Sequence, residues 1–248
     1  MSHRYWHGGV YREQGEYARA EALYSEGVNA ARRVLGPEHP DTLGYASNLG
    51  HVYDDEGKQA RAEALLRDTL EKQRRVLGAG HPDTIQTLQY LASMYQLQGK
   101  YASAETYTSQ ALAAKRKAVG AENADTMDIA ADLLLAYISQ GKFAEAEPLA
   151  REAVQFERKE ESDGWQRFRA ETELGAALSG QTKYTEAEPL LVEGYRGLSA
   201  RVDRIPADER YYLRYAREWL VQLYRAWGKP VKATEMSQLP HGVPGPPH

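Results

Sequence analysis

The chain has 248 residues, of which 42% are hydrophobic and 27% are charged, and its net charge at pH 7 is −4. This composition is ordinary for a soluble protein with a large buried surface, and it gives no electrostatic support for bulk binding to nucleic acid or to an anionic membrane. No run of about 18 apolar residues predicts a membrane span. The chain has no cysteine, which excludes disulfides and thiolate sites. With no signal-peptide core at the start, we expect a cytoplasmic protein.

A seven-residue motif recurs at a fixed interval along the chain. Four copies begin 42 residues apart, and two weaker copies follow 41 and 46 residues later; the six copies begin at Gly15, Gly57, Gly99, Gly141, Thr182 and Gly228. Such a period is typical of a stacked repeat array, in which each repeat buries its apolar face against its neighbours. The sequence therefore predicts one repeat domain over residues 1–237, with approximate repeat bounds 1–41, 42–83, 84–125, 126–164, 165–207 and 208–237.

The first repeat begins inside a helical pattern, with no polar capping helix before it. Because a repeat array normally needs capped ends, two explanations stay open. The chain is part of a longer protein, or a partner covers the first repeat. A second copy of the chain is one such partner, so self-association through the uncapped first repeat is an expectation of the sequence.

A second periodic motif joins the first repeats. The run LGPEHPDT at 35–42 returns as LGAGHPDT at 77–84 and, in decayed form, as VGAENADT at 119–126. We expect its aspartates to cap the next helix and its prolines to stop the segment before; these are Asp41, Asp83 and Asp125, and Pro40 and Pro82. The recurring His and Asp sit on separate loops, roughly 10 Å or more apart, too far for one metal ion.

Each repeat is predicted to contain two antiparallel helices, A and B. In the second repeat the apolar residues Leu43, Ala46, Leu49, Val52 and Tyr53 follow the spacing of a helix, and no stretch alternates with period two. The turn glycine permits a positive φ between the two helices. About twelve helices in an all-α fold are therefore expected.

The repeat motif also predicts how the helices pack. Small residues should allow close contact between helices A and B; they are Gly50, Ala92 and Gly175 on helix A, and Ala20, Ala62, Ala104, Ala146 and Ala187 on helix B. Aromatic residues should fill the space between repeats; they are Tyr17, Tyr101, Phe143 and Tyr184. A recurring glutamate should make a capping or inter-repeat hydrogen bond; its copies are Glu21, Glu63, Glu105, Glu147 and Glu188.

The later part of the chain is less regular. In the fifth repeat Leu178 stands where other repeats carry tyrosine, and Thr182 stands where they carry the turn glycine. The aromatic-rich stretch 210–227 is expected to form a terminal capping helix. The Pro/Gly-rich tail 238–248 is expected to be disordered.

These motifs resemble the tetratricopeptide repeat in its long, kinesin-light-chain-like form. The usual repeat has about 34 residues, and the eight extra residues here lengthen helix B and its exit loop. The resemblance implies a right-handed α-α superhelix of about six helix-turn-helix repeats, with the A helices lining a concave groove. The aromatic-rich end is similar to that of bacterial multidomain proteins that join a Ser/Thr kinase to such repeats.

The groove is the predicted functional surface. The position nine residues before each turn carries Trp6, Asn48, Tyr90, Asp132, Glu173 and Trp219. The resemblance implies that an asparagine here holds the backbone of an extended peptide, and only Asn48 matches. An amide suits this role because it donates and accepts hydrogen bonds. With neighbours one helical turn away, the candidate peptide-binding residues are Asn48, His51, Asp54, Tyr90, Asp128, Asp132 and Glu173. Alternatively, these side chains only form a solvated inner surface, and Tyr90 and Trp6 pack between helices.

The charges of the candidate site indicate the kind of partner. Carboxylates gather in the middle of the groove, which favours a net basic peptide. The first ladder positions lack the lysines and arginines of chaperone-binding relatives, which argues against a ligand with an acidic C-terminus. No phosphate-binding loop, nucleophile elbow or zinc-binding helix motif is present, so we expect no catalytic residue, metal or cofactor.

The sequence thus predicts a protein–protein interaction module, not an enzyme, that binds a peptide segment in the concave groove. Two alternatives stay open. The repeats could be the scaffold or regulatory arm of a larger bacterial signalling protein, for example a Ser/Thr kinase, or they could form a self-associating array.

Overall fold

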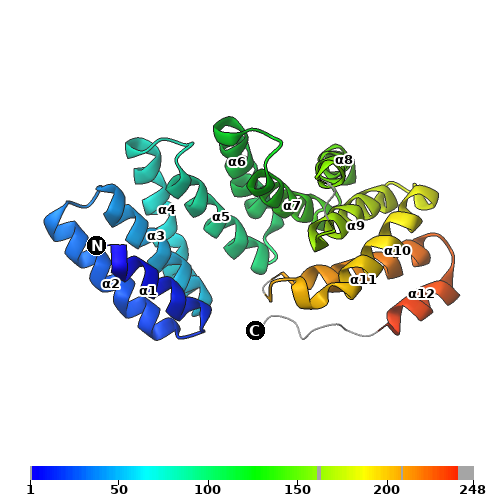
Figure 1. Ribbon diagram of the computed structural model, residues 1–248, viewed down its shortest axis with the longest axis horizontal. Helices are drawn as coiled ribbons and strands as arrows, with labels where there is room; N and C mark the ends of the chain where they lie inside the picture. The colour runs from blue at the N-terminus through cyan, green and yellow to red at the C-terminus, as the bar shows by residue number, and fades with distance from the viewer. Residues whose placement is uncertain (1, 161–162, 208, 240–248) are drawn as a thin grey trace. The chain divides into compact units, whose positions relative to one another are not determined.

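The computed structural model describes residues 2–160, 163–207 and 209–239, with side chains described from Gly8 onward. Within these ranges the chain forms twelve α-helices and one short 3-10 helix, and no strand (Figure 1). The predicted all-α fold is confirmed. Most of the tail that we expected to be disordered, residues 240–248, lies outside the described ranges.

The chain divides into two compact units, Met1–Ile129 and Ala130–His248, and the boundary falls within helix α7. The first unit holds α1 (Ser2–Glu13), α2 (Tyr17–Val34), α3 (Pro40–Asp55), α4 (Gln59–Val76), α5 (Pro82–Leu97) and α6 (Tyr101–Val119), and the start of α7 (Ala124–Ser139). The second unit holds the rest of α7, then α8 (Phe143–Lys159), α9 (Trp165–Gly180), α10 (Tyr184–Ala200), the 3-10 helix (Val202–Arg204), α11 (Tyr211–Ala226) and α12 (Pro230–Ser237).

Odd-numbered helices are the predicted A helices, and even-numbered helices are the B helices (Figure 1). The turn between helices A and B requires a residue in the left-handed backbone region, as the recurring glycine indicated. Gly57 has φ +74°, and the next amide, Lys58 N–H, bonds back to the Tyr53 carbonyl at 2.7 Å. Thr182 takes the same place in the fifth repeat with φ +63°, and among the described residues it alone has a positive φ without being glycine.

The junction motif caps the A helices differently from the prediction. The capping acceptor of α3 is the His39 side chain, whose Nδ1 accepts the Asp41 backbone N–H at 3.2 Å; His81 does the same for α5. Asp41 lies within the first helical turn, where its charge suits the helix dipole. The prediction that proline stops the preceding segment is also wrong. Pro40 opens α3, since its ring presets a helical φ and its missing N–H is not needed there.

Helices A and B pack closely at the small residues that the sequence predicted. A Cβ at Gly50 would lie 2.7 Å from Leu66 Cδ2, and one at Gly175 would lie 2.6 Å from Leu191 Cγ. The predicted helix-B alanines are fully buried; they are Ala20, Ala62, Ala104, Ala146 and Ala187. The predicted register of both helices is therefore confirmed.

Aromatic side chains fill space between consecutive repeats, as expected. Phe143 at the start of α8 packs against Gly180 at the end of α9, where a Cβ would lie 2.3 Å from its ring. Tyr184 at the start of α10 stacks on Trp227, which follows α11, with 5.7 Å between ring centroids. In both cases the aromatic residue of one helix B contacts the end of the next helix A.

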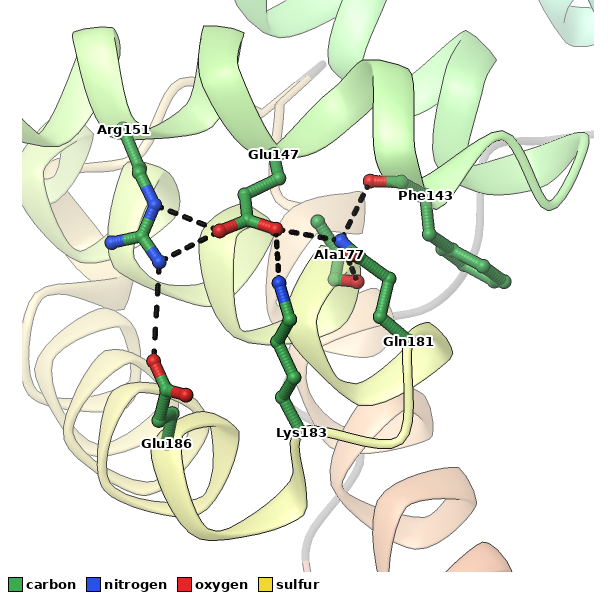
Figure 2. Close-up of polar contacts among 7 residues, drawn as sticks. All are labelled: Phe143, Glu147, Arg151, Ala177, Gln181, Lys183 and Glu186. Atoms are coloured by element: carbon green, nitrogen blue, oxygen red, sulfur yellow. Dashed lines mark hydrogen bonds and ion pairs between the residues drawn. The ribbon is translucent and has the colours of Figure 1, made fainter.

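At three of its copies the recurring glutamate of helix B links one repeat to the next. Glu21 accepts from Lys58 at 2.6 Å, and Glu188 accepts from the Tyr224 hydroxyl at 2.9 Å. Figure 2 shows the most elaborate case, in which Glu147 on α8 accepts from Lys183 at 2.7 Å and from Gln181 at 2.8 Å. The expected inter-repeat hydrogen bond is confirmed at these three positions.

Candidate functional site

The predicted site residues lie on A helices of both units, and we call the surface that they form within each unit the helix-A face of that unit. It comprises the ladder position nine residues before each turn and the positions one helical turn from it. In the first unit its members are Asn48, His51, Asp54, Tyr90 and Asp128; in the second unit they are Asp132 and Glu173. The side chain of Trp6, the first ladder residue, is outside the described part of the chain.

Asn48 is fixed by neighbours on two A helices. Its Nδ2 donates to the Gly44 carbonyl of α3 at 2.9 Å, and its Oδ1 accepts from the Tyr90 hydroxyl of α5 at 3.2 Å. The two ladder residues are 42 positions apart, so consecutive repeats bring them into contact. The amide is half-buried and held in one orientation.

His51 completes this cluster of the first unit. Its ring packs against the Tyr90 ring with 3.9 Å between centroids. Burial, together with the smaller effect of the nearby Arg12 guanidinium, lowers the pKa of His51 to about 3. His51 is therefore neutral at physiological pH, and its buried Nδ1 has no hydrogen-bond partner. Tyr90 thus packs between α3 and α5, and its role in peptide binding stays a prediction.

Asp54 and Asp55 bring negative charge to the end of α3. Burial, together with the smaller effect of the neighbouring Asp55 carboxylate, raises the pKa of Asp54 to about 6. Asp55 Oδ2 pairs with Arg12 Nε of α1 at 2.9 Å. Asp128 on α7 is exposed. The helix-A face of the first unit thus combines a fixed amide, a neutral imidazole and carboxylates.

The two site residues of the second unit differ sharply in exposure. Asp132 is half-buried, whereas Glu173 on α9 has no exposed surface. The expectation that Glu173 pairs directly with a ligand charge therefore conflicts with its burial. The reason is the aromatic helix α11, which packs against α9.

Sequence reasoning missed the aromatic surroundings of Arg169 on α9. This guanidinium is 4% exposed and lies between the rings of Trp165 and Tyr212, at 5.1 and 5.5 Å from their centroids. Glu209 pairs with it at 3.6 Å. The signal was present in the aromatic-rich stretch 210–227, which the sequence analysis assigned only to a capping helix.

The described residues hold no cluster of three or more His, Cys, Asp or Glu side chains that could bind a metal ion. A hollow of ≈ 400 Å³ in the second unit is lined by α8, α9 and α10, including Arg151, Arg158, Leu174 and Leu190. None of the predicted site residues lines it. No helix within the described ranges combines the length and the apolar character needed to cross a bilayer.

Comparison with known proteins decides the family. The model of the tetratricopeptide repeat matches residues 2–75, 60–117 and 90–159. The chain belongs to the tetratricopeptide repeat family. Repeats of this family generally mediate protein–protein interactions, and proteins built from them are typically scaffolds without catalytic activity. No curated protein matches the sequence of this tetratricopeptide repeat chain.

Solved structures agree with the predicted long repeat. Nearly identical TPR-like repeats of a putative kinesin light chain from Podosopora anserina are 25% identical, with a TM-score of 0.70, over 82% of this chain and 97% of that one. BtubC (BKLC) from P. vanneervenii is 20% identical, with a TM-score of 0.68, over 80% of each chain. A tetratricopeptide repeat protein from Parabacteroides merdae is 19% identical, with a TM-score of 0.63, over 95% of this chain and 76% of that one. The kinesin-light-chain-like repeat type is thereby confirmed.

Proposed function

We propose that the helix-A face binds an extended peptide segment of a partner protein. The observation that carries this proposal is Asn48, whose amide is held by the Gly44 carbonyl and the Tyr90 hydroxyl. A side chain that is already oriented loses little conformational entropy when it binds a peptide backbone. An amide can also donate to a backbone carbonyl or accept from a backbone N–H. Asn48 would therefore set the register of the bound segment.

The charge of this face favours a net basic segment. Asp54, Asp128 and Asp132 each keep part of their surface exposed, so a lysine or arginine of the partner could approach them. Partly enclosed carboxylates attract cations more strongly than fully solvated ones, and salt screens that attraction over about 8–10 Å. Glu173 is buried and would contribute through its field alone.

The test is a peptide-array screen with the purified chain, followed by affinity measurement on the best segment. We expect net basic segments whose affinity falls as salt rises. Asn48→Ala should weaken binding by about threefold, since one backbone hydrogen bond is worth about 0.5–1.5 kcal/mol. Asp132→Lys should weaken it by about tenfold, because it replaces an attraction by a repulsion.

The matched control is Asp68→Lys, the same charge reversal on α4. Asp68 is exposed and pairs with Lys72 on its own helix, away from the helix-A face. This variant should leave affinity within about twofold, as for a screened surface charge. Recovery of mainly acidic segments, or equal loss in the two reversed variants, would contradict the charge argument.

The two alternatives from the sequence, a scaffold arm and a self-associating array, stay proposals. Neither a scaffold arm of a larger signalling protein nor self-association through the first repeat is favoured by a specific contact of the described residues. Light scattering across a concentration series would test self-association directly.

A further inference from the structure

The hollow of ≈ 400 Å³ in the second unit lies where the fifth repeat departs from the repeat pattern. The position four residues before the turn carries tyrosine in every other repeat, as at Tyr95 and Tyr224, but leucine in the fifth, at Leu178. Leu178 lines the hollow. A second lining residue, Leu190 of α10, occupies the position that Tyr107 has in the third repeat.

The third repeat shows what occupies this place when both tyrosines are present. Tyr95 of α5 and Tyr107 of α6 stack on each other there, with 5.6 Å between ring centroids. Leucine lacks the outer ring atoms and the hydroxyl of tyrosine, so Leu178 and Leu190 fill less of the equivalent space. Because protein interiors are otherwise closely packed, the hollow corresponds to the place of a missing aromatic ring.

The glutamate next to the missing tyrosine is bonded without it. In the last repeat the Tyr224 hydroxyl donates to Glu188 of the repeat before, at 2.9 Å. The corresponding glutamate of the fourth repeat, Glu147, accepts instead from Lys183 and Arg151, each at 2.7 Å (Figure 2). A ring that entered the hollow would therefore need no hydroxyl to satisfy this carboxylate.

The rest of the lining is mainly apolar, with guanidinium groups at its edge. Val154 of α8 and Leu174 of α9 are buried apolar residues of the lining, and Pro189 of α10 is an exposed one. Arg151 and Arg158, both on α8, are exposed and line the same hollow. Apolar walls with a few polar groups are typical of sites that hold the anchor residue of a partner.

The arginines at the edge have carboxylate partners, and these leave the planar face of a guanidinium available to a ring. Arg158 lies 3.8 Å from Glu171. The chain itself contains an arginine that does both: Arg201 pairs with Asp163 and also lies over the Phe168 ring, 4.4 Å from its centroid. Cation–aromatic contact of this kind favours an aromatic anchor over an aliphatic one.

We propose that this hollow binds an aromatic side chain of a partner protein. The ring would lie against Leu178 and Leu190, in the place that the stacked tyrosines fill in the third repeat, with Arg158 at its edge. A protein segment is the occupant that fits, because repeats of this family generally mediate protein–protein interactions. No residue of either helix-A face lines the hollow, so this inference goes beyond the proposed function and does not depend on it.

The test uses three blocked heptapeptides of the form Gly-Ser-Gly-Xaa-Gly-Ser-Gly, in which Xaa is phenylalanine, leucine or alanine. Each is titrated with the full chain and followed by saturation-transfer NMR of the peptide. The phenylalanine probe should bind about two- to fivefold more tightly than the leucine probe, the range of an exposed cation–aromatic contact, and the alanine probe should bind most weakly. Equal binding of the phenylalanine and alanine probes, or no binding by any probe, would overturn the proposal.

Filling the hollow from within the chain locates the binding. Leu178→Tyr and Leu190→Tyr each restore a tyrosine that the third repeat carries, and each should weaken the phenylalanine probe about fivefold or more, since a second ring would overpack the site. Leu65→Tyr is the matched control; it makes the same change in the second repeat, at the position equivalent to Leu190, and should leave binding unchanged. Thermal melts establish that each variant is folded. Unchanged binding in both filled variants would place the ring elsewhere and reject the hollow.

A substitution at the edge tests the preference for a ring. Arg158→Gln removes the guanidinium and should bring the ratio of phenylalanine to leucine affinity to about one, with the leucine probe unaffected. Arg75→Gln, the same change at an exposed arginine of α4, should preserve the ratio. A ratio that Arg158→Gln leaves unaltered would contradict the aromatic preference.

The outcomes also separate this inference from the proposed function. Asn48→Ala should leave the affinity of the phenylalanine probe unchanged, and Leu178→Tyr should leave the basic segments of the array screen bound. If the probe responds to Leu178→Tyr while no segment responds to Asn48→Ala, the aromatic site stands and the backbone role of Asn48 fails. The opposite pattern rejects the aromatic site and keeps peptide binding.

Discussion

Glu147 on α8 and Lys183 before α10 form an inter-repeat ion pair at 2.7 Å (Figure 2). Glu147 also accepts from Arg151 of its own helix, at 2.7 Å to Nη2. These donors, Lys183 first, lower the pKa of Glu147 to about 2. The Glu147 side chain is 16% exposed, whereas that of Lys183 is 40% exposed. Solvent therefore screens part of the attraction between the two charges.

We predict that Glu147→Gln lowers the free energy of unfolding by about 1–2 kcal/mol at pH 7, after allowance for solvent screening. Because the folded-state pKa is lowered, the stabilisation is fully present above the unfolded pKa of about 4.3 and is lost as pH falls towards 2. Urea denaturation at pH 7 and at pH 3 measures this difference. Asp68→Asn is the control, since Asp68 pairs with Lys72 of its own helix. Equal losses in both variants would contradict an inter-repeat role.

Thr182 is strained in the turn of the fifth repeat. A β-branched residue with φ +63° pays about 1–2 kcal/mol that glycine avoids, although glycine loses more entropy on folding. We predict that Thr182→Gly raises the free energy of unfolding by about 0.5–1 kcal/mol. The reverse change at an equivalent turn, Gly99→Thr, should be destabilising. Thermal melts of both variants measure the effect, and a less stable Thr182→Gly variant would show that the threonine is not strained.

Gly175 on α9 allows close approach of Leu191 on α10. We predict that Gly175→Ala destabilises the protein by about 1–2 kcal/mol, because overpacking costs more than the helix propensity that alanine gains. The added Cβ would lie 2.6 Å from Leu191 Cγ and 3.2 Å from its backbone N. Gly80→Ala, with no atom within 4 Å of the added Cβ, is the matched control and should be nearly neutral. Chemical denaturation compares the two; a neutral Gly175→Ala would mean that the helices separate at little cost.

Asp54 should oppose folding when it is ionised. Its pKa is raised to about 6 by burial and by Asp55, so its ionisation above pH 6 costs stability, and that cost disappears as pH falls towards the unfolded value of about 3.9. We predict that Asp54→Asn raises the free energy of unfolding by about 1 kcal/mol at pH 8, with a smaller gain at pH 5. Asp128→Asn, which removes an exposed carboxylate from α7, is the control variant. A gain that is the same at both pH values would rule out the titration of Asp54 as its cause.

The local features of the repeat could be predicted from the sequence because they depend on residues close together in the chain. The period of the turn motif located the helix pairs, and the small residues at Gly50 and Gly175 identified the close contacts that the structure contains. Even the irregular turn was visible, since Thr182 stands at a glycine position and adopts the glycine conformation.

The exposure and partners of the site residues were decided by the tertiary structure. Asn48 and Tyr90 share one ladder, but their hydrogen bond follows from the distance between consecutive A helices. Glu173 belongs to the same ladder and is buried, because α11 packs against α9 and brings Tyr212 close to it. The capping role of His39, too, depends on the path of its loop. Periodicity determines which residues occupy equivalent positions, whereas burial and pairing depend on what the neighbouring repeat places opposite each of them.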